Sequence, residues 1–258
     1  SPLATRHSPL PPLSTVQVLY EDNHLLVVNK PAGLATMGAQ SGEASVHQWA
    51  CDYLRKKYNK PGNVFVGVVS RLDAKTTGTL VLARTSKAAS RLSIQFGGPG
   101  KHKKVSTKAV KIYLAVVEGH LEHDSRLTAT GTLIDSVWKD ETAMRMRTAT
   151  SPREDAKEAR LEYELLHQSA DAALVAVRLA TGRKHQIRLQ FADRGHPILG
   201  DRKYGSRVAF PSGVALHSWR LLISHPTTEE RMELTAELPQ AWRRSLSWLP
   251  PTLETGLW

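Results

Sequence analysis

The chain has 258 residues, 41% of them hydrophobic and 23% charged, which is the composition of an ordinary globular protein. Lysine and arginine number 35 against 24 aspartates and glutamates, and the net charge of +11 indicates a polyanionic partner. No apolar run approaches the roughly 18 residues of a membrane span. No signal peptide is visible and Cys51 has no partner for a disulfide, so we expect a cytoplasmic protein without a membrane partner.

The first half of the chain predicts alternating strands and helices. Residues 1–15 hold four prolines and few large apolar groups, which predicts a flexible tail. Strands are expected at 16–20 and 25–28, before a turn built on proline and glycine. Ser45 is placed to cap a helix whose apolar residues recur every three or four positions.

A polar loop then interrupts extended structure. Residues 64–69 predict a buried strand, 70–78 a polar loop and 79–83 a second extended segment. Thr85 or Ser86 can cap a helix that runs to about Phe96, where a glycine-rich stretch ends it.

The second half of the chain is richer in strands. A strand is expected at 111–117, and the polar residues 120–158 are compatible with a hairpin that has long loops. Alternating apolar residues predict two half-buried strands, at 161–165 and 175–179. A helix is expected from Lys184 to Arg194, with Gly195 placed to stop it.

This order of elements lacks a steady strand–helix alternation. It favours an α+β fold with a mixed, largely antiparallel central sheet flanked by helices and loops. We expect a folded domain over residues 16–240 and a C-terminal extension over 241–258. Since about 15 residues precede the domain, no separate N-terminal RNA-binding domain is expected.

Asp73 lies on the predicted loop, between a strand-like run and a Thr-Thr-Gly turn. A rigidly held aspartate can act as a nucleophile or a base. The alternative is a turn aspartate that caps the amide of Lys75 or Thr76, and the loop alone favours this alternative.

Arg188 falls on the apolar side of the predicted helix, with Ile187 and Phe191. A buried arginine requires a carboxylate or phosphate partner, but the spacing does not say which acid it meets. The alternative is a side chain that extends its head group to solvent. Gly182 and Arg183 precede the helix and form a natural anion site.

Other candidates are an aromatic residue and a run of cations. Tyr113, on a predicted strand, is either a core residue or a side chain that stacks on a base. A basic cluster suits a solvated loop and phosphate binding equally, and comprises Lys101, His102, Lys103, Lys104, Lys108 and Lys111. The scattered histidines show no metal-ligand spacing, so no metal is expected.

Six segments, in one order, resemble the RluA-type pseudouridine synthases. They begin with Asn29-Lys30-Pro31-Ala32-Gly33-Leu34, then Ser70-Arg71-Leu72-Asp73 with Thr76-Thr77-Gly78, and Lys111-Ile112-Tyr113-Leu114-Ala115. Thr181-Gly182-Arg183-Lys184-His185-Gln186-Ile187-Arg188, His196-Pro197-Ile198-Leu199-Gly200-Asp201 and Leu216-His217-Ser218-Trp219-Arg220-Leu221 follow. The resemblance spans roughly residues 16–235. It implies the pseudouridine synthase fold over the folded domain and the isomerisation of uridine to pseudouridine in structured ribosomal or transfer RNA.

The resemblance also implies residue roles. Asp73 matches the catalytic aspartate, Tyr113 the tyrosine that packs on the target base and is a candidate for proton transfer at C5, and Arg188 the partner of the aspartate. Arg71 matches the arginine that enters the RNA where the base leaves. Leu189 is expected to line the uracil pocket, and Arg183 and Lys184 to contact RNA. The reaction needs no cofactor, and we expect a monomer.

Some positions depart from the family pattern. Ser70 replaces a common histidine, Thr77 a common serine, and Ala74 and Lys75 more typical polar or charged residues. These changes bear on the choice of RNA, which we expect to depend on loops 97–110 and 120–158.

Three rival functions remain to be weighed. A non-catalytic RNA-binding module would not need Asp73, Tyr113 and Arg188 together, and all three are present. A hydrolase or transferase of another class leaves the other five segments unexplained. A DNA-binding protein lacks a helix-turn-helix or finger signature here.

Overall fold

The computed structural model describes residues 16–38, 44–98, 107–121, 127–211 and 213–255. The strands are β1 (Gln17–Glu21), β2 (Leu25–Lys30), β3 (Gly67–Val68), β4 (Thr77–Ala83), β5 (Val110–Glu118), β6 (Thr130–Asp140), β7 (Arg145–Thr148), β8 (Lys157–Gln168), β9 (Ala172–Leu179), β10 (Leu216–Ser224) and β11 (Arg231–Thr235). The helices are α1 (Val46–Lys57), α2 (Ser86–Gln95), α3 (Gln186–Ala192), α4 (Gln240–Ser245) and the 3-10 turn η3 (Arg202–Tyr204).

The described strands form one eleven-stranded sheet. Its order is β1-β2-β4-β10-β5-β9-β8-β6-β7, with β11 paired to β10 and β3 to β4. Strands β4 and β10 run parallel, and the other described pairs run antiparallel. The expected α+β fold with a mixed, largely antiparallel sheet is confirmed.

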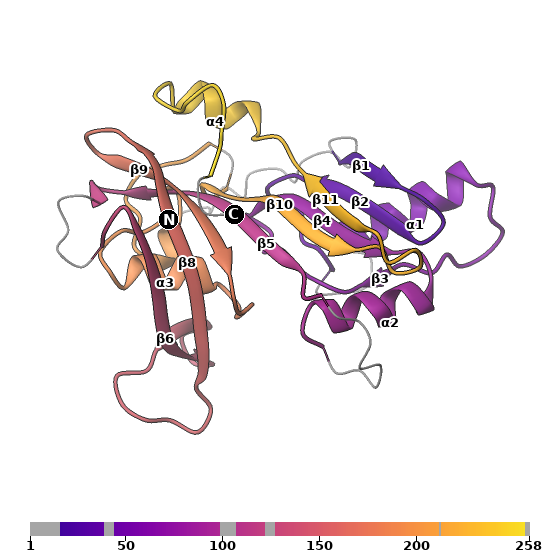
Figure 1. Cartoon of the computed structure of the whole chain (residues 1–258), viewed down its shortest axis with the longest axis horizontal. Coiled ribbons are helices and arrows are strands. Elements are labelled where there is room, and N and C mark those ends of the chain that lie inside the picture. Colours follow the sequence, from indigo (N-terminus) through magenta and orange to yellow (C-terminus); the bar gives the residue numbers. More distant parts are fainter. Residues whose placement is uncertain (1–15, 39–43, 99–106, 122–126, 212, 256–258) are drawn as a thin grey trace, which may run out of the picture.

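The sheet has two halves that meet at β5 and β10 (Figure 1). Helices α1 and α2 lie beside β1, β2 and β4 at one end, and α3 lies beside β6 and β8 at the other. Because β4 and β10 are neighbours, the loop that enters β4 comes to the junction of the halves. Residues near this junction can therefore be drawn from both halves.

Strand β2 contains four consecutive apolar residues, Leu25 to Val28, and both faces of the sheet are buried there. Leu26 and Val28 face the large core that contains the apolar face of α1, whereas Leu25 and Val27 face a second core formed with α2. All four are fully buried because helices cover both faces of the sheet. The burial of both faces explains the absence of a polar alternation in this segment.

Two of the three predicted helix starts are confirmed. Ser45 caps α1, accepting a hydrogen bond from the Gln48 amide, and Thr85 caps α2, accepting one from the Ala88 amide. The helix expected at Lys184–Arg194 is present but shorter, since α3 begins at Gln186 after a left-handed residue, His185.

Two strand predictions were wrong in part. Of residues 64–69, only Gly67 and Val68 pair with β4, and Phe65 is 50% exposed. Strand β9 is buried over Ala172–Val177 instead of half-buried, because it lies between β5 and β8 inside the sheet. Strand β8 does alternate, as expected. The hairpin within 120–158 is β6 and β7, joined by a short turn.

The C-terminal stretch packs on the same core as the rest of the domain. Trp242 is fully buried, with its ring against those of Phe210 and His217. Leu246 and Leu249 belong to the same apolar cluster. The predicted tail over residues 1–15 lies outside the described residues. No described helix has the length and apolar character needed to cross a membrane.

Candidate active site

Asp73 lies on the loop between β3 and β4, where hydrogen bonds fix the backbone on both sides of it. Thr36 Oγ1 donates to the Leu72 carbonyl at 2.8 Å and accepts from the Leu72 amide at 3.1 Å. The Thr76 amide donates to the backbone carbonyl of Asp73 at 3.0 Å. The turn is thus closed by the carbonyl, and the carboxylate of Asp73 is left 29% exposed.

Lys30 is a fully buried cation beneath this loop. Its ammonium donates to the carbonyls of Pro31 (2.8 Å), Leu34 (2.8 Å) and Ala74 (3.0 Å). Burial lowers the pKa of Lys30 to about 7, and the nearby charge of Asp73 opposes this shift. Three carbonyls match the three protons of an ammonium, so Lys30 ties the turn after β2 to the residue that follows Asp73.

Gly78 allows the loop to enter the sheet beside β10. Its φ is +110°, and a Cβ atom there would lie 2.2 Å from the Ser218 carbonyl oxygen. The preceding Thr77 hydroxyl is 2.7 Å from Nδ1 of the buried His217. A glycine is therefore required at 78, because both its conformation and the close approach of β10 exclude a side chain.

Arg188, on α3, joins two carboxylates. Its Nη1 donates to Asp73 Oδ2 at 2.9 Å, and its Nε and Nη2 donate to the two oxygens of Asp201 at 2.6 and 2.8 Å. The side chains of Arg188 and Asp201 are 5% and 1% exposed. Burial opposes the charge of Arg188, but Asp201 and then Asp73 outweigh it and raise the pKa of Arg188. The contact with Asp73 that the resemblance implied is present, and Asp201 is a second partner.

His185 lies next to the same carboxylate, in a left-handed conformation with φ of +54°. Its Nε2 is 3.6 Å from Asp73 Oδ2, and its Nδ1 is 2.8 Å from the Tyr204 hydroxyl. That hydroxyl accepts a hydrogen bond from the Met146 amide, which leaves its own proton for Nδ1. The Nε2–H of His185 is consequently directed at Asp73. Burial lowers the pKa of His185 to about 4, although Asp73 opposes the shift, so the ring is neutral at neutral pH.

Asp73 opens into a cavity of about 390 Å³ whose wall includes Tyr113. Tyr113 is 8% exposed, and burial, with a smaller contribution from Asp73, raises its pKa to about 12 against a hydrogen bond from Ser218. The phenol is therefore protonated at neutral pH. Among the described residues, none donates to Asp73 Oδ1, so this oxygen is available to a molecule in the cavity.

The other predicted residues divide into two groups. Arg71, Arg183 and Lys184 are exposed side chains that line the cavity. Leu189 does not line it: this side chain is 1% exposed and packs with Val137, Met146, Ala159 and Tyr204 on the other side of α3. Its neighbours Ile187 and Arg188 line the cavity instead.

Sequence reasoning assigned no role to Lys30, His185, Asp201 and Tyr204. Lys30, His185 and Asp201 lie inside the quoted segments, but a lysine before a Pro-Gly turn or a histidine at a helix start has several ordinary explanations. The partner of Arg188 is 13 residues away and reaches it through the turn at η3. The demand of a buried arginine for an acid was the available signal, and it did not identify Asp201.

The remaining sequence features add little to the site. In the basic cluster, Lys101, His102, Lys103 and Lys104 lie outside the described residues, as do parts of loops 97–110 and 120–158. Within the described part of the chain, no three histidine, cysteine or acidic side chains gather as metal ligands would.

The comparison with protein families matches residues 24–193 to RNA pseudouridylate synthase. Ribosomal large subunit pseudouridine synthase D of Nitrosomonas europaea is 32% identical over 235 residues, covering 87% of this chain and 62% of the relative. Ribosomal large subunit pseudouridine synthase C of Vibrio cholerae is 30% identical over 238 residues, covering 89% of this chain and 68% of the relative. The chain thus spans less than two thirds of the length of the first of these relatives.

Solved structures show the same fold. Human RNA pseudouridylate synthase domain containing 1 superposes with a TM-score of 0.72 at 23% identity, covering 96% of this chain and 93% of the human one. Human RNA pseudouridylate synthase domain containing 4 gives a TM-score of 0.71 at 22% identity, covering 90% of this chain and 92% of the human one. The chain belongs to the RluA-type family of RNA pseudouridylate synthases.

Proposed function

We propose that this protein isomerises uridine to pseudouridine in large-subunit ribosomal RNA, with Asp73 as the catalytic residue. The observation that carries the proposal is a carboxylate that Arg188 holds through one oxygen, that has no described donor on the other, and that lines a cavity together with Tyr113. The names of the relatives, ribosomal large subunit pseudouridine synthases C and D, support this class of RNA as the substrate.

The reaction breaks the N1–C1′ bond of uridine, turns the uracil over and joins C5 to C1′. C5 loses a proton and N1 gains one, so no redox partner, metal or cofactor is required. Asp73 Oδ1 is placed either to attack the nucleoside or to offset the positive charge that develops as the bond breaks. Arg188 orients the carboxylate through its ion pair, and His185 presents an N–H to the same oxygen as Arg188.

Tyr113 packs on the uracil while it is held in the cavity. Its raised pKa makes the hydroxyl a hydrogen-bond donor in the resting enzyme, with proton transfer at C5 as its further candidate role. Ile187 supplies an apolar wall. Arg71, Arg183 and Lys184 are placed at the cavity to contact RNA, and Arg71 is the candidate to fill the space that the uridine leaves.

The target uridine must leave its stack to reach Asp73, which costs a few kcal/mol. Basic side chains around the cavity offset this cost through phosphate contacts. All of these groups come from one chain, so we propose that the enzyme acts as a monomer. A ribosomal substrate also supports the cytoplasm as its location.

The test is to incubate total RNA from cells that lack the gene with purified wild-type protein or Asp73→Asn, and to map pseudouridine. We expect one or a few uridines of large-subunit ribosomal RNA to convert with the wild type, with or without EDTA, and none with Asp73→Asn. Conversion by folded Asp73→Asn would refute the role of Asp73. A folded wild-type protein that converts no uridine in any RNA would refute the proposed activity.

A further inference from the structure

A second cavity, of about 440 Å³, adjoins the cavity beside Asp73 and shares Arg71 and Tyr113 with it. The residues that line both cavities are Arg71, Leu72, Tyr113, Leu179, Gly182 and Arg183. Further parts of the second cavity come from the end of α2, around Phe96, and from the start of β5. A strand of RNA that places one nucleotide against Asp73 would pass this second cavity next.

The lining of this cavity carries charge of one sign. It includes Arg71, Lys108, Lys111 and Arg183, and among the described residues that line it there is no aspartate or glutamate. Four cations without a carboxylate repel one another, so the cavity is suited to an anion. The catalytic cavity differs, because there Asp73 faces the cations.

Lys111 is the central member of this set, since it projects from an interior strand. Its ammonium lies 6.0 Å from the centroid of the Phe96 ring, and no described carboxylate forms an ion pair with it. Burial lowers the pKa of Lys111. A largely enclosed lysine without an acid is costly unless a ligand supplies the negative charge.

Gly182 lies next to this ammonium. Its backbone lies directly over Lys111, and a Cβ atom at 182 would be 3.2 Å from the ammonium nitrogen. A side chain at 182 would therefore require the ammonium to shift by a few tenths of an ångström. Because residue 182 has no side chain, the loop before α3 leaves space for the Lys111 ammonium.

We propose that the second cavity is a phosphate subsite, in which Lys111 holds the backbone phosphate of a nucleotide adjacent to the target uridine. This inference rests on the proposed function for the identity of the RNA. Arg71 and Arg183, which line both cavities, contact the same stretch of backbone. The subsite fixes which nucleotide enters the catalytic cavity by holding its neighbour.

The test compares Lys111→Met with Lys87→Met, which removes the same charge from an exposed position on α2. Binding to the substrate RNA and turnover are measured from 50 to 300 mM salt. We expect Lys111→Met to weaken binding about tenfold, to reduce the log–log salt slope by roughly 0.7–0.9, and to change kcat less than threefold at saturating RNA. Lys87→Met should behave as the wild type, and Lys111→Arg should retain most of the affinity.

The outcomes are distinguishable. An unchanged slope in folded Lys111→Met, or equal losses in Lys111→Met and Lys87→Met, overturns the subsite. If Lys111→Met does not fold, the slope is read from Lys111→Gln, and an unchanged slope there overturns the subsite equally. Inorganic phosphate should compete with RNA more strongly than chloride at equal ionic strength, and only when Lys111 is present. A wild-type protein that shows this competition and slope without forming pseudouridine would retain the subsite and lose the proposed function.

Discussion

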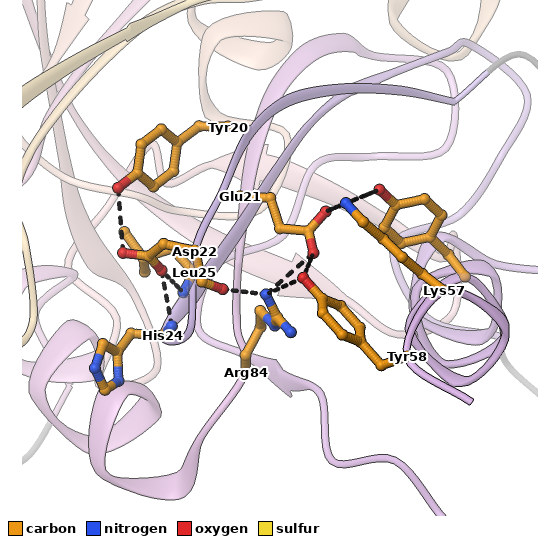
Figure 2. Close-up of polar contacts among 9 residues, drawn as sticks. Tyr20, Glu21, Asp22, His24, Leu25, Lys57, Tyr58 and Arg84 are labelled. Atoms are coloured by element: carbon orange, nitrogen blue, oxygen red, sulfur yellow. Dashed lines mark hydrogen bonds and ion pairs between the residues drawn. The ribbon is translucent and has the colours of Figure 1, made fainter. Parts of the chain in front are cut away.

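Glu21 and Asp73 are both held by cations, and they differ in how many of their oxygen atoms are occupied. Both oxygens of Glu21 accept hydrogen bonds, from Tyr53 (2.8 Å), Lys57 (2.7 Å), Tyr58 (2.6 Å) and Arg84 (3.1 Å) (Figure 2). Its side chain is 8% exposed. We call these five residues the Glu21 cluster. Every accepting position is used within the fold, so the cluster has a structural role.

Asp73 is held on one side only. Arg188 occupies Oδ2, His185 lies near the same atom, and no described residue donates to Oδ1. The Glu21 cluster joins β1, α1 and the end of β4, all at one end of the sheet, whereas Asp73 and Arg188 join the two halves. The ion pair alone thus does not distinguish the two carboxylates, whereas the oxygen without a described donor and the adjoining cavity do.

The largest expected effect is a loss of activity when Asp73 is changed, with no loss when Glu21 is changed. Asp73→Asn keeps the shape of the side chain and removes its charge, so we expect kcat to fall by roughly 10⁴-fold or more, with a small change in stability. Glu21→Gln should leave kcat unchanged and lower the free energy of unfolding by about 1–3 kcal/mol, because an NH2 group that donates replaces one of the two accepting oxygen atoms. Single-turnover assays and urea melts measure both effects. A loss of activity in Glu21→Gln at unchanged stability would break the comparison.

Variants of Arg188 test which of its two carboxylate partners, Asp73 or Asp201, contributes more to the stability of the folded protein. Arg188→Met should abolish activity and cost roughly 3–5 kcal/mol, because buried Asp201 loses its counter-charge. Adding Asp201→Asn to Arg188→Met should recover more stability than adding Asp73→Asn, since Asp201 is 1% exposed and Asp73 29%. Neither double variant should recover activity. Denaturant melts of the single and double variants give the coupling energies. Strictly additive losses for Arg188 and Asp201 would contradict the pairing.

Local features of this fold could be predicted from the sequence, and long-range partners could not. The caps at Ser45 and Thr85 depend on neighbouring residues, so the helix starts were predicted correctly. The register that places β10 beside Gly78 depends on residues 140 positions apart. Asp201 was missed for the same reason, because its approach to Arg188 is set by a turn and by packing. The contact of Arg188 with Asp73 came from the resemblance, since helical spacing alone did not identify it.

The pH dependence of stability should differ between His217, on β10, and Glu21, on β1. Burial lowers the pKa of His217 to about 4, from an ordinary 6.5. Between these values the unfolded chain binds a proton that the folded chain does not, so stability falls as the pH falls, by roughly 3 kcal/mol at pH 4. Hydrogen bonds lower the pKa of Glu21 despite its burial, so its stabilisation is lost only below about pH 4.5.

Urea melts from pH 3 to 7 test this order. His217→Gln should flatten the dependence between pH 6.5 and 4, and Glu21→Gln should flatten it only below that range. His217 also bonds Thr77 and the Ala236 carbonyl, so the slope with pH, and not the stability at one pH, is the informative quantity. Parallel curves for the wild type and His217→Gln would show that His217 titrates normally in the folded protein.

The smallest expected effects come from removing two tyrosine hydroxyls, that of Tyr204 beside His185 and that of Tyr58 in the Glu21 cluster. Tyr204 accepts from the Met146 amide and donates to His185, so Tyr204→Phe removes the contact that sets which nitrogen of His185 faces Asp73. We expect kcat to fall about tenfold, equivalent to about 1.4 kcal/mol in the barrier, with KM little changed. Tyr58→Phe removes one of four donors to Glu21 and should cost at most about 1 kcal/mol of stability, with kcat unchanged. Steady-state kinetics distinguish the two, because a purely structural Tyr204 would lower the melting temperature and leave kcat intact. His185→Gln is the further check: if Tyr204 acts through His185, adding Tyr204→Phe to His185→Gln should produce little additional loss of kcat.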